Sequence, residues 1–384
     1  MKKICFVTTI YLTYKCFLKQ LSEYLYQTGE YDISLICNDE PEVYEDIPEF
    51  VHFLPVKMER GVSLSLFSSI KEIQKVLEKE NFDIVQYSTP NAAFYTSIAA
   101  KKAKVPVRLY CQWGIRYMGF EGWKRALFKK LEKITCDNST FIEAESHNIR
   151  SFSLGEGLYT EEKSCVIWNG SASGVDLTKF DASKKDVWKQ KIRSEYGIDE
   201  NDVVFTFAAR LTADKGINEL LEAFINLKDK YDNIRLIVMG GMDDNESLNS
   251  ELMKKAQETD KVIFTGSVPN VEEFNAAADV FISPSYREGF GLVVIEAQAM
   301  GIPAIVSDVP GQVDAIAPDE TGLLCRVKDA ASLAEQMETF IKDEETRKQM
   351  GANAQKFVEE NFEQKKLFEY LKKNRDLLSG DNNA

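Results

Sequence analysis

The chain has 384 residues, of which 44% are hydrophobic and 28% charged, and its formal net charge is −14. This length and composition suit two globular domains and exclude a disordered chain, and the lack of any run of about 18 apolar residues predicts no membrane-spanning helix. The excess of Asp and Glu falls almost entirely in residues 181–384, which argues against nucleic acid as a partner because nucleic acid requires a basic face.

The cysteines and histidines bound the chemistry further. Seven scattered cysteines without Cys-x-x-Cys spacing argue against a disulfide framework and against zinc, and they favour a reducing cytoplasm. The only histidines, His52 and His147, exclude a histidine-rich metal site, and the Asp243-Asp244 pair is interpreted as a solvated loop. Residues 1–10 lack the apolar core and cleavage site of a signal peptide, so we expect them to form the first strand.

Segments of strand and helix type alternate through residues 1–180. Strands are expected at residues 4–9, 33–37, 51–56, 82–87 and 105–110. Helices are expected between them, among others at residues 69–79 and 93–102. Alternation at this spacing indicates βαβ units and a parallel sheet.

The most basic segment of the chain covers residues 123–134. Its apolar side chains share one face of a helix, and these are Trp123, Leu127, Leu131 and Ile134. Its lysines lie elsewhere on the helix, and these are Lys124, Lys129, Lys130 and Lys133. A basic amphipathic helix with Trp at its edge either rests on an anionic membrane surface or packs its apolar stripe on the sheet of the first domain. Both interpretations remain open at this point.

The same alternation continues in the second half. Strands are expected at residues 203–208, 234–239, 262–266, 279–283, 304–308 and 322–324. The chain is therefore expected to form two doubly wound α/β domains, residues 1–180 and 181–362, with ligands at the carboxyl ends of the strands.

Residues 284–303 follow the expected strand at 279–283. Gly289 and Gly291 permit a tight loop in which the backbone approaches a ligand closely, and a helical pattern begins at about Leu292. The free N–H groups and the positive end of the dipole at such a helix start form a phosphate site.

Two carboxylates, Glu288 and Glu296, flank this turn with seven residues between them. Carboxylates are poor phosphate ligands but good acceptors for sugar hydroxyls. A phosphate site bracketed by two such acceptors indicates a ligand with phosphates in the middle and hydroxyls at both ends, which describes a nucleotide sugar.

The Arg-Glu-Gly-Phe-Gly…Glu pattern of residues 287–296 resembles the E-x7-E signature of retaining glycosyltransferases with the GT-B fold, in the large family 4 group. The resemblance implies two Rossmann-like domains that face a cleft, with the donor in the acidic second domain and the acceptor in the first. It also implies that a C-terminal helix, residues 363–378, packs back on the first domain.

The resemblance also implies roles for the residues of the turn. Glu288 would hold the hydroxyls of the donor sugar, and Glu296 would hold the ribose. The diphosphate would lie on the backbone of the helix start, formed by Gly289, Phe290, Gly291 and Leu292.

Two cations and a second turn complete the implied donor site. Arg210 and Lys215 match an Arg and a Lys that neutralise the donor diphosphate in the family, so with Glu288 they are the candidate catalytic residues. Because these cations would replace a metal, no metal is expected. Gly266 and Val268 lie in the turn that packs against the nucleotide base in relatives.

The first half departs from the family pattern. The loop after the first strand, residues 8–13, has no glycine, and Trp113 stands where many relatives have a histidine near the reacting carbon. Thr9, Trp113 and Arg116 are assigned to the acceptor or reacting-carbon region. For Arg116, contact with an acceptor phosphate and a surface salt bridge are equally compatible with the sequence.

The resemblance thus implies transfer of a sugar, an N-acetylated amino sugar by analogy with bacterial surface-polysaccharide enzymes, from a UDP-sugar to a polyprenyl-diphosphate-linked saccharide. The UDP-sugar is a co-substrate, no cofactor is expected, and the enzyme is expected in the cytoplasm or peripherally on the inner face of the plasma membrane. One alternative is a catalytically weak partner subunit that binds nucleotide sugar. The other, an NAD-dependent oxidoreductase, conflicts with the lack of a Gly-x-Gly-x-x-Gly motif after the first strand.

Overall fold

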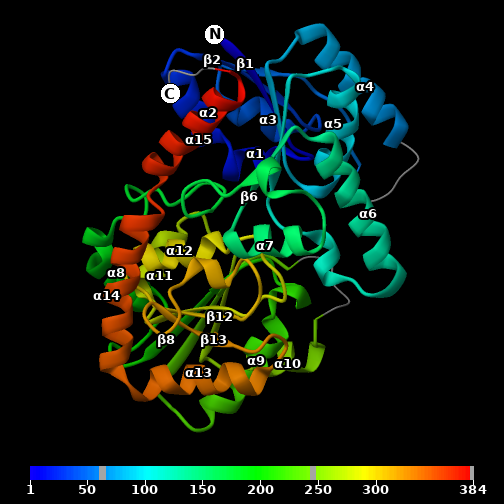
Figure 1. Ribbon diagram of the computed structural model, residues 1–384. Coiled ribbons are helices and arrows are strands. Elements are labelled where there is room, and N and C mark those ends of the chain that lie inside the picture. Colours follow the sequence, from blue (N-terminus) through cyan, green and yellow to red (C-terminus); the bar gives the residue numbers. More distant parts are fainter. Residues whose placement is uncertain (60–65, 243–247, 381–384) are drawn as a thin grey trace. The chain divides into compact units, whose positions relative to one another are not determined.

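A computed structural model describes residues 1–59, 66–242 and 248–380. The chain divides into two compact units (Figure 1). Unit 1 comprises Met1–Ser173 with Lys365–Ala384, and unit 2 comprises Gly174–Gln364. The Asp243-Asp244 pair lies outside the described residues, so its interpretation as a solvated loop stays a prediction.

Unit 1 is built on a seven-stranded sheet in which every strand pair is parallel. Its spatial order is β3-β2-β1-β4-β5-β6-β7, so the winding reverses between β1 and β4. The strands are β1 (Lys2–Val7), β2 (Tyr31–Ile36), β3 (Val51–Phe53), β4 (Ile84–Tyr87), β5 (Val107–Gln112), β6 (Phe141–Ala144) and β7 (Ser164–Cys165).

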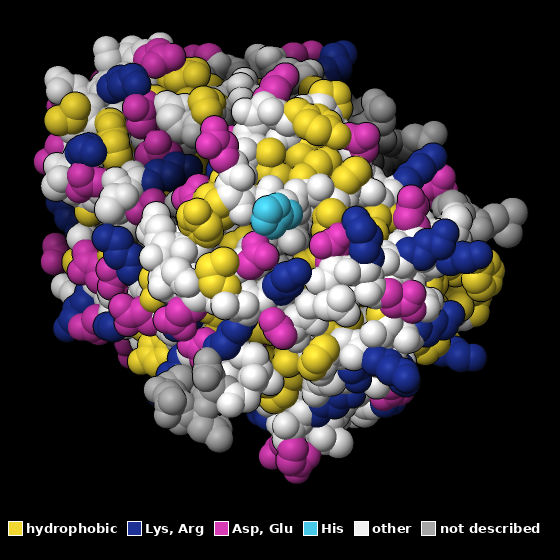
Figure 2. Space-filling model, turned by 90° about the horizontal axis from the view of Figure 1, so that it is seen from above, with side chains coloured by type: hydrophobic (Ala, Val, Ile, Leu, Met, Phe, Trp, Pro, Cys, Tyr) yellow, Lys and Arg dark blue, Asp and Glu magenta, His cyan; other side chains and the backbone are white. Residues whose placement is uncertain are grey.

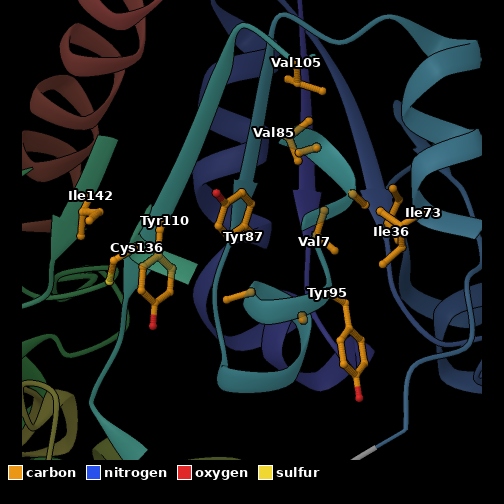
Figure 3. Close-up of a cluster of buried hydrophobic side chains, with 14 of the residues drawn as sticks. Val7, Ile36, Ile73, Val85, Tyr87, Tyr95, Val105, Tyr110, Cys136 and Ile142 are labelled. Carbon is orange, nitrogen blue, oxygen red and sulfur yellow. The ribbon is translucent and has the colours of Figure 1, made fainter. Parts of the chain in front are cut away.

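Helices cover both faces of this sheet. They are α1 (Tyr11–Phe17), α2 (Lys19–Gln27), α3 (Pro41–Asp46), α4 (Leu66–Glu80), α5 (Pro90–Lys102), α6 (Gly122–Asn138), α7 (His147–Gly155) and α15 (Gln364–Leu378), with the short 3₁₀ helices η1 (Arg116–Gly119) and η2 (Glu161–Lys163). Strand β1 shows the two faces directly: Cys5 and Val7 pack into the cluster under α4 and α5, whereas Ile4 and Phe6 pack into the cluster under α2 and α15. Figure 3 shows part of the first cluster. Burial on both faces explains why β1 is apolar throughout its second half rather than alternating.

The C-terminal helix α15 is fastened to unit 1 by buried charges. The guanidinium of Arg375 pairs with the carboxylate of Glu143 on β6 at 2.6 Å, and its side chain is only 1% exposed. Arg375 also donates to Gln86 on β4 at 2.8 Å. The next residue, Asp376, accepts from the hydroxyl of Tyr31 on β2 at 2.5 Å. Helix α15 therefore reaches polar groups of three strands.

Unit 2 repeats the plan with six parallel strands in the order β10-β9-β8-β11-β12-β13. The strands are β8 (Val203–Ala208), β9 (Ile234–Met239), β10 (Val262–Gly266), β11 (Val280–Ser283), β12 (Ala304–Ser307) and β13 (Gly322–Cys325). The helices are α8 (Lys185–Glu195), α9 (Ile217–Lys228), α10 (Ser250–Gln257), α11 (Val271–Ala277), α12 (Leu292–Ala299), α13 (Ala330–Lys342) and α14 (Glu344–Asn361), with the 3₁₀ helices η3 (Ala182–Lys184), η4 (Ala213–Lys215) and η5 (Val313–Ala315).

The predicted fold class, α/β with two doubly wound Rossmann-like domains, is confirmed. In unit 2, α9, α10 and α13 contribute to the core on one face of the sheet, and α11, α12 and α14 contribute to the clusters on the other. Of the helices in the described ranges, none combines the length and apolar composition needed to span a bilayer.

Candidate functional site

The candidate site of unit 2 lies where two neighbouring strands end. Strands β8 and β11 pair in parallel, so their carboxyl ends lie at the same edge of the sheet. Residues 209–216 follow β8 and residues 284–291 follow β11. The sequence predicted functional residues in both loops, and the sheet places these loops next to each other.

Charged pairs join the two loops. The Nζ of Lys215 donates to Oε1 of Glu288 at 2.6 Å, and both side chains remain partly exposed, at 21% and 19%. Arg287 pairs with the carboxylate of Asp214 at 3.1 Å. The backbone N–H of Tyr286 donates to the carbonyl of Asp214 at 2.9 Å. The structure thus brings the predicted Lys215 and Glu288 together and holds their loops in register.

The loops approach each other closely because Gly216 has no side chain. Its φ of +74° is in the left-handed region, and a Cβ at this position would lie 2.1 Å from the carbonyl oxygen of Pro284. Gly216 is also the N-cap of α9, so the same residue ends the loop and begins the helix.

Asp214 connects the predicted cations. Burial alone would raise the pKa of its carboxyl, but a hydrogen bond from the hydroxyl of Thr212 and nearby cations outweigh burial, and the pKa is lowered. The cations that lower this pKa are Arg287, Lys215 and Arg210. Arg210 is exposed and follows β8 within two residues. Both predicted cations therefore act on one carboxylate that the sequence analysis did not single out.

Helix α12 begins at Leu292, as the sequence predicted. Its N-cap is Gly291, with φ +99°, and no side chain caps its first N–H groups. The ring of Phe290 is buried and packs edge-on against Phe362 with centroids 5.2 Å apart. This packing holds the backbone at Phe290 in place. The N–H of Val294 donates to the carbonyl of Gly291 at 2.9 Å, so the amides at the start of α12 that can bind an anion are those of Leu292 and Val293.

A loop that the sequence analysis missed supports this turn. A Cβ at Gly311, whose φ is +87°, would lie 2.5 Å from the carbonyl oxygens of both Glu288 and Gly289. The adjacent Gln312 donates through Nε2 to the carbonyl of Ser283 at 2.6 Å. The Pro310-Gly311 dipeptide signals a turn in the sequence, but nothing local says which loop it touches.

Glu296 has a different environment from Glu288. It is half-buried on α12, and burial raises the pKa of its carboxyl to about 7, while Lys179 lowers that pKa and Glu272 raises it further. Lys179 and Glu272 themselves form an ion pair at 3.6 Å. The two glutamates of the motif thus have separate partners in the structure.

Gly266 and Val268 follow β10, at the edge of the unit 2 sheet. Gly266 has φ +68°, and Val268 is half-buried against the cluster that contains Ile237 and Phe274. Its contact with a nucleotide base stays a prediction.

In unit 1 the predicted residues lie after β1 and β5. Thr9 is buried, with its Oγ1 3.3 Å from that of Thr89 after β4. The ring of Trp113 packs against Phe17 with centroids 5.2 Å apart. Arg116 lies on η1 with its guanidinium 4.6 Å from the centroid of the Phe128 ring. Thr9, Trp113 and Arg116 therefore contact different neighbours, and their assignment to an acceptor site stays a prediction.

Helix α6 buries a different face from the apolar stripe seen in the sequence. Trp123 is 71% exposed and Leu127 is 40% exposed. The buried residues of α6 are Glu132, Thr135 and Cys136. The N-terminal half of the stripe is therefore not used for packing on the sheet.

No group of three or more His, Cys, Asp or Glu side chains that could hold a metal ion is found in the described part of the chain. The candidate site consists instead of a lysine–glutamate pair, a second cation and the uncapped start of α12.

Two doubly wound units with parallel sheets, with charged loops at the carboxyl ends of the strands, have the architecture of the GT-B class of glycosyltransferases. Two family models match the chain: "Glycosyl transferases group 1" over residues 189–357 and "Glycosyl transferase 4-like" over residues 3–146. The chain belongs to this family of GT-B glycosyltransferases and is a glycosyltransferase.

Similar proteins agree with the family. The capsular polysaccharide biosynthesis glycosyltransferase CapM of Staphylococcus aureus is 30% identical over 344 residues, which cover 88% of each chain. The N,N'-diacetylbacillosaminyl-diphospho-undecaprenol alpha-1,3-N-acetylgalactosaminyltransferase of Campylobacter jejuni is 31% identical over 308 residues, 76% of this chain and 77% of the relative.

Solved structures share the fold across nearly the whole chain. Sucrose-phosphate synthase from Thermosynechococcus elongatus superposes with a TM-score of 0.80 at 18% identity, covering 98% of this chain and 99% of its own. HepE from Anabaena in complex with UDP superposes with a TM-score of 0.79 at 17% identity, covering 98% and 100%. At these identities the likeness concerns the fold.

Proposed function

We propose that the chain transfers a sugar, with retained configuration, from a UDP-sugar to a polyprenyl-diphosphate-linked saccharide during synthesis of a bacterial surface polysaccharide such as capsule. The names of relatives support the surface polysaccharide, the UDP-sugar and the lipid-linked acceptor. CapM is a capsular enzyme, the Campylobacter relative acts on an undecaprenol-diphosphate sugar, and an Escherichia coli relative 28% identical over 317 residues uses UDP-Gal with a diphosphoundecaprenol acceptor. By analogy with the Campylobacter relative, the donor sugar is an N-acetylated amino sugar.

The observation that carries the proposal is the Lys215–Glu288 pair beside the start of α12. A nucleoside diphosphate gains negative charge as it leaves the sugar, so fixed cations and free amides aimed at it lower the barrier. Lys215 supplies a point charge, and Arg210 can bind two oxygens at once. Because Lys215 and Glu288 are only partly buried, a bound donor can replace each as the partner of the other. Its diphosphate then pairs with Lys215, and its sugar hydroxyls donate to Glu288.

We assign the remaining roles by the same chemistry. Glu288 accepts hydrogen bonds from hydroxyls of the donor sugar, and Glu296 accepts them from the ribose. Gly266 and Val268 flank the base. The cations take the place of a metal ion, so we propose a metal-independent reaction.

The transfer itself needs one bond to break and one to form. The bond from the anomeric carbon to the phosphate oxygen breaks, and the acceptor oxygen bonds to the same face of that carbon. The proton of the acceptor hydroxyl goes to the departing phosphate oxygen. Configuration is then retained without a covalent enzyme intermediate, and the released nucleotide is UDP.

The exposed part of α6 supports contact with a membrane surface. Trp123 and Leu127 are exposed, as are Lys124 and Lys130. In Figure 2, the edge on the side where α6 lies in Figure 1 shows Lys and Arg side chains together with apolar ones. Apolar anchors with flanking lysines favour an anionic bilayer surface. We therefore propose that the enzyme works in the cytoplasm, peripherally on the inner face of the plasma membrane.

The donor assignment is tested by thermal denaturation with UDP-, GDP- and ADP-sugars. We expect stabilisation by UDP-sugars above all. Stabilisation by NAD alone would instead favour an oxidoreductase. UDP release is then measured with and without a polyprenyl-diphosphate-linked saccharide, in buffer containing EDTA. Binding without acceptor-dependent release would identify a catalytically weak partner subunit, and the anomeric configuration of the product checks retention.

Membrane contact is tested by co-sedimentation with vesicles that contain phosphatidylglycerol. Changing Trp123→Ala and Leu127→Ala together should release the protein from the vesicles. The control is Val187→Ala, which removes an equally exposed apolar side chain from unit 2 and should leave sedimentation unchanged.

A further inference from the structure

Unit 1 contains a pocket that the donor site does not use. It lies between α5, α6 and η1, beside the first residue of α4, and has a cavity volume of about 100 Å³. Its walls are mainly apolar, with Leu66, Phe94, Phe128 and Leu131 among the side chains that form them. All these residues belong to unit 1.

The charged groups of the wall differ in what they do. Glu132 is buried, and its Oε1 accepts hydrogen bonds from the hydroxyl of Tyr110 and the Nε2 of Gln112, both at 2.8 Å. Burial raises the pKa of the Glu132 carboxyl above its usual range, and the hydrogen bonds from Gln112 and Tyr110 offset part of that rise. Arg116 supplies the only cation of the described lining and lies over the ring of Phe128. The pocket therefore joins apolar walls to one guanidinium.

The size of the pocket excludes several ligands. Its volume is below the roughly 150 Å³ of a cavity that holds benzene, so a sugar or a nucleotide does not fit. Among these ligands a short branched hydrocarbon group comes nearest to this volume, and apolar walls favour it over a polar group of the same size.

Two exposed apolar side chains are sequence neighbours of wall residues. Phe67 follows Leu66 of the wall, Leu127 precedes Phe128 of the wall, and both Phe67 and Leu127 are exposed.

We propose that this pocket binds the isoprene unit nearest the diphosphate of the polyprenyl acceptor and that Arg116 binds that diphosphate. The inference rests on the proposed function, which supplies the lipid-linked acceptor. In a polyprenyl diphosphate the first branched unit is bonded directly to a phosphate oxygen, so an apolar pocket and a cation must lie side by side. The 4.6 Å between the Arg116 guanidinium and the Phe128 ring meets this requirement. A glycerophospholipid places glycerol and ester groups between its phosphate and its chains, and this spacing does not match.

The probe for this site is geranyl diphosphate, titrated calorimetrically into the full chain. Inorganic pyrophosphate and geraniol serve as its two halves. We expect geranyl diphosphate to bind at least tenfold more tightly than either half. Dioctanoyl phosphatidylglycerol should not compete, and competition at equal concentration would overturn the assignment to a polyprenyl chain.

Variants separate the two parts of the site. Leu131→Trp fills the pocket and should weaken geranyl diphosphate binding at least tenfold while leaving pyrophosphate binding unchanged. Leu131→Phe is the milder alternative if the tryptophan variant does not fold. Arg116→Gln should weaken both diphosphates. Leu377→Trp, on the exposed surface of α15 in the same unit, is the matched control and should change neither.

Near-ultraviolet circular dichroism, compared with wild type, reports whether unit 1 of each variant is folded, because binding of UDP in unit 2 reports on unit 2 alone. If transfer to a polyprenyl-diphosphate acceptor occurs but Leu131→Trp changes neither geranyl diphosphate binding nor the KM for that acceptor, the pocket assignment alone is wrong. If no UDP-sugar is transferred but geranyl diphosphate binding depends on Leu131, the lipid pocket stands and the proposed function fails.

Discussion

One charged pair from each unit shows two different uses of charge, although both units are doubly wound parallel sheets. In unit 2, the Lys215–Glu288 pair lies on loops at the carboxyl ends of β8 and β11, and its side chains are 21% and 19% exposed. In unit 1, Arg375 and Glu143 pair between the sheet and α15, and their side chains are 1% and 7% exposed. The first pair can exchange its partner for a ligand, whereas the second is a fixed part of the fold.

Solvation explains this difference. A partly exposed pair gains little stability, because water solvates each charge well when the pair separates. A buried pair has already lost that solvation, so removing one member leaves an uncompensated charge. Arg375 also donates a hydrogen bond to Gln86, and Asn374 donates one to Glu143, so the buried pair belongs to a hydrogen-bond network. We therefore expect the Arg375–Glu143 pair of unit 1 to control stability and the Lys215–Glu288 pair of unit 2 to control turnover.

The largest effect is expected from Arg375→Met. This change leaves Glu143 buried without its cation and should lower the free energy of unfolding by about 3–5 kcal/mol. Urea denaturation measures the loss. Lys348→Ala breaks an exposed pair with Glu344 on α14 and should leave the free energy of unfolding nearly unchanged. Equal losses for the two variants would remove the contrast between the units.

The second effect concerns turnover. Glu288→Ala and Lys215→Ala should each lower the rate of sugar transfer by about 10²–10³-fold, which corresponds to about 3–4 kcal/mol of transition-state stabilisation. The melting temperature should change little, because the pair is partly exposed. Lys191→Ala is the control, since Lys191 and Glu273 form another pair at 2.6 Å in unit 2. Near-normal transfer by Glu288→Ala would contradict its assignment.

The third effect tests how closely the loops of unit 2 must approach. Gly216→Ala combines an unfavourable φ with a collision against the carbonyl of Pro284, and we expect a loss of about 2–3 kcal/mol in unfolding free energy. Gly197→Ala has a similar φ of +63° but no atom within 4 Å of the new Cβ, so it should cost about 1 kcal/mol. If both variants lose the same stability, the contact with Pro284 contributes nothing.

The smallest effect concerns pH. The folded state raises the pKa of Glu296 from 4.5 to about 7, so between these values it binds more protons than the unfolded state, and stability falls as pH rises. Glu296→Gln removes this penalty. The unfolding free energy of the variant minus that of wild type should therefore be about 1–2 kcal/mol larger at pH 8 than at pH 4.5. A stability difference that does not vary with pH would show that Glu296 titrates normally.

The sequence predicted best where local patterns decide. The strand before the site, the glycine loop and the helix start at Leu292 all follow from a short apolar run, two glycines and a helical period. The motifs also predicted that Lys215 and Glu288 belong to one site, and parallel neighbouring strands bring both loops to one edge, but the ion pair between them was not predicted.

The sequence failed where a residue depends on distant partners. Strand β6 was not predicted, because it is only four residues long and contains Glu143, whose partner Arg375 lies 232 positions away. The sequence also left the buried face of α6 open, and that face includes Glu132 because Tyr110 and Gln112 of β5 donate hydrogen bonds to it. Asp214, Gly311 and Gln312 support the site through contacts that no local pattern reveals.

The membership of α15 in unit 1 has a consequence for synthesis on the ribosome. The chain passes from unit 1 to unit 2 and back again. The segments at these two crossings are hydrogen-bonded, since the N–H of Val175 donates to the carbonyl of Phe362 at 2.8 Å. All of unit 2 is translated before α15 emerges. Until α15 emerges, Glu143 of the nascent unit 1 lacks its partner, the guanidinium of Arg375. Unit 2 can therefore finish folding before unit 1, although it is synthesised later.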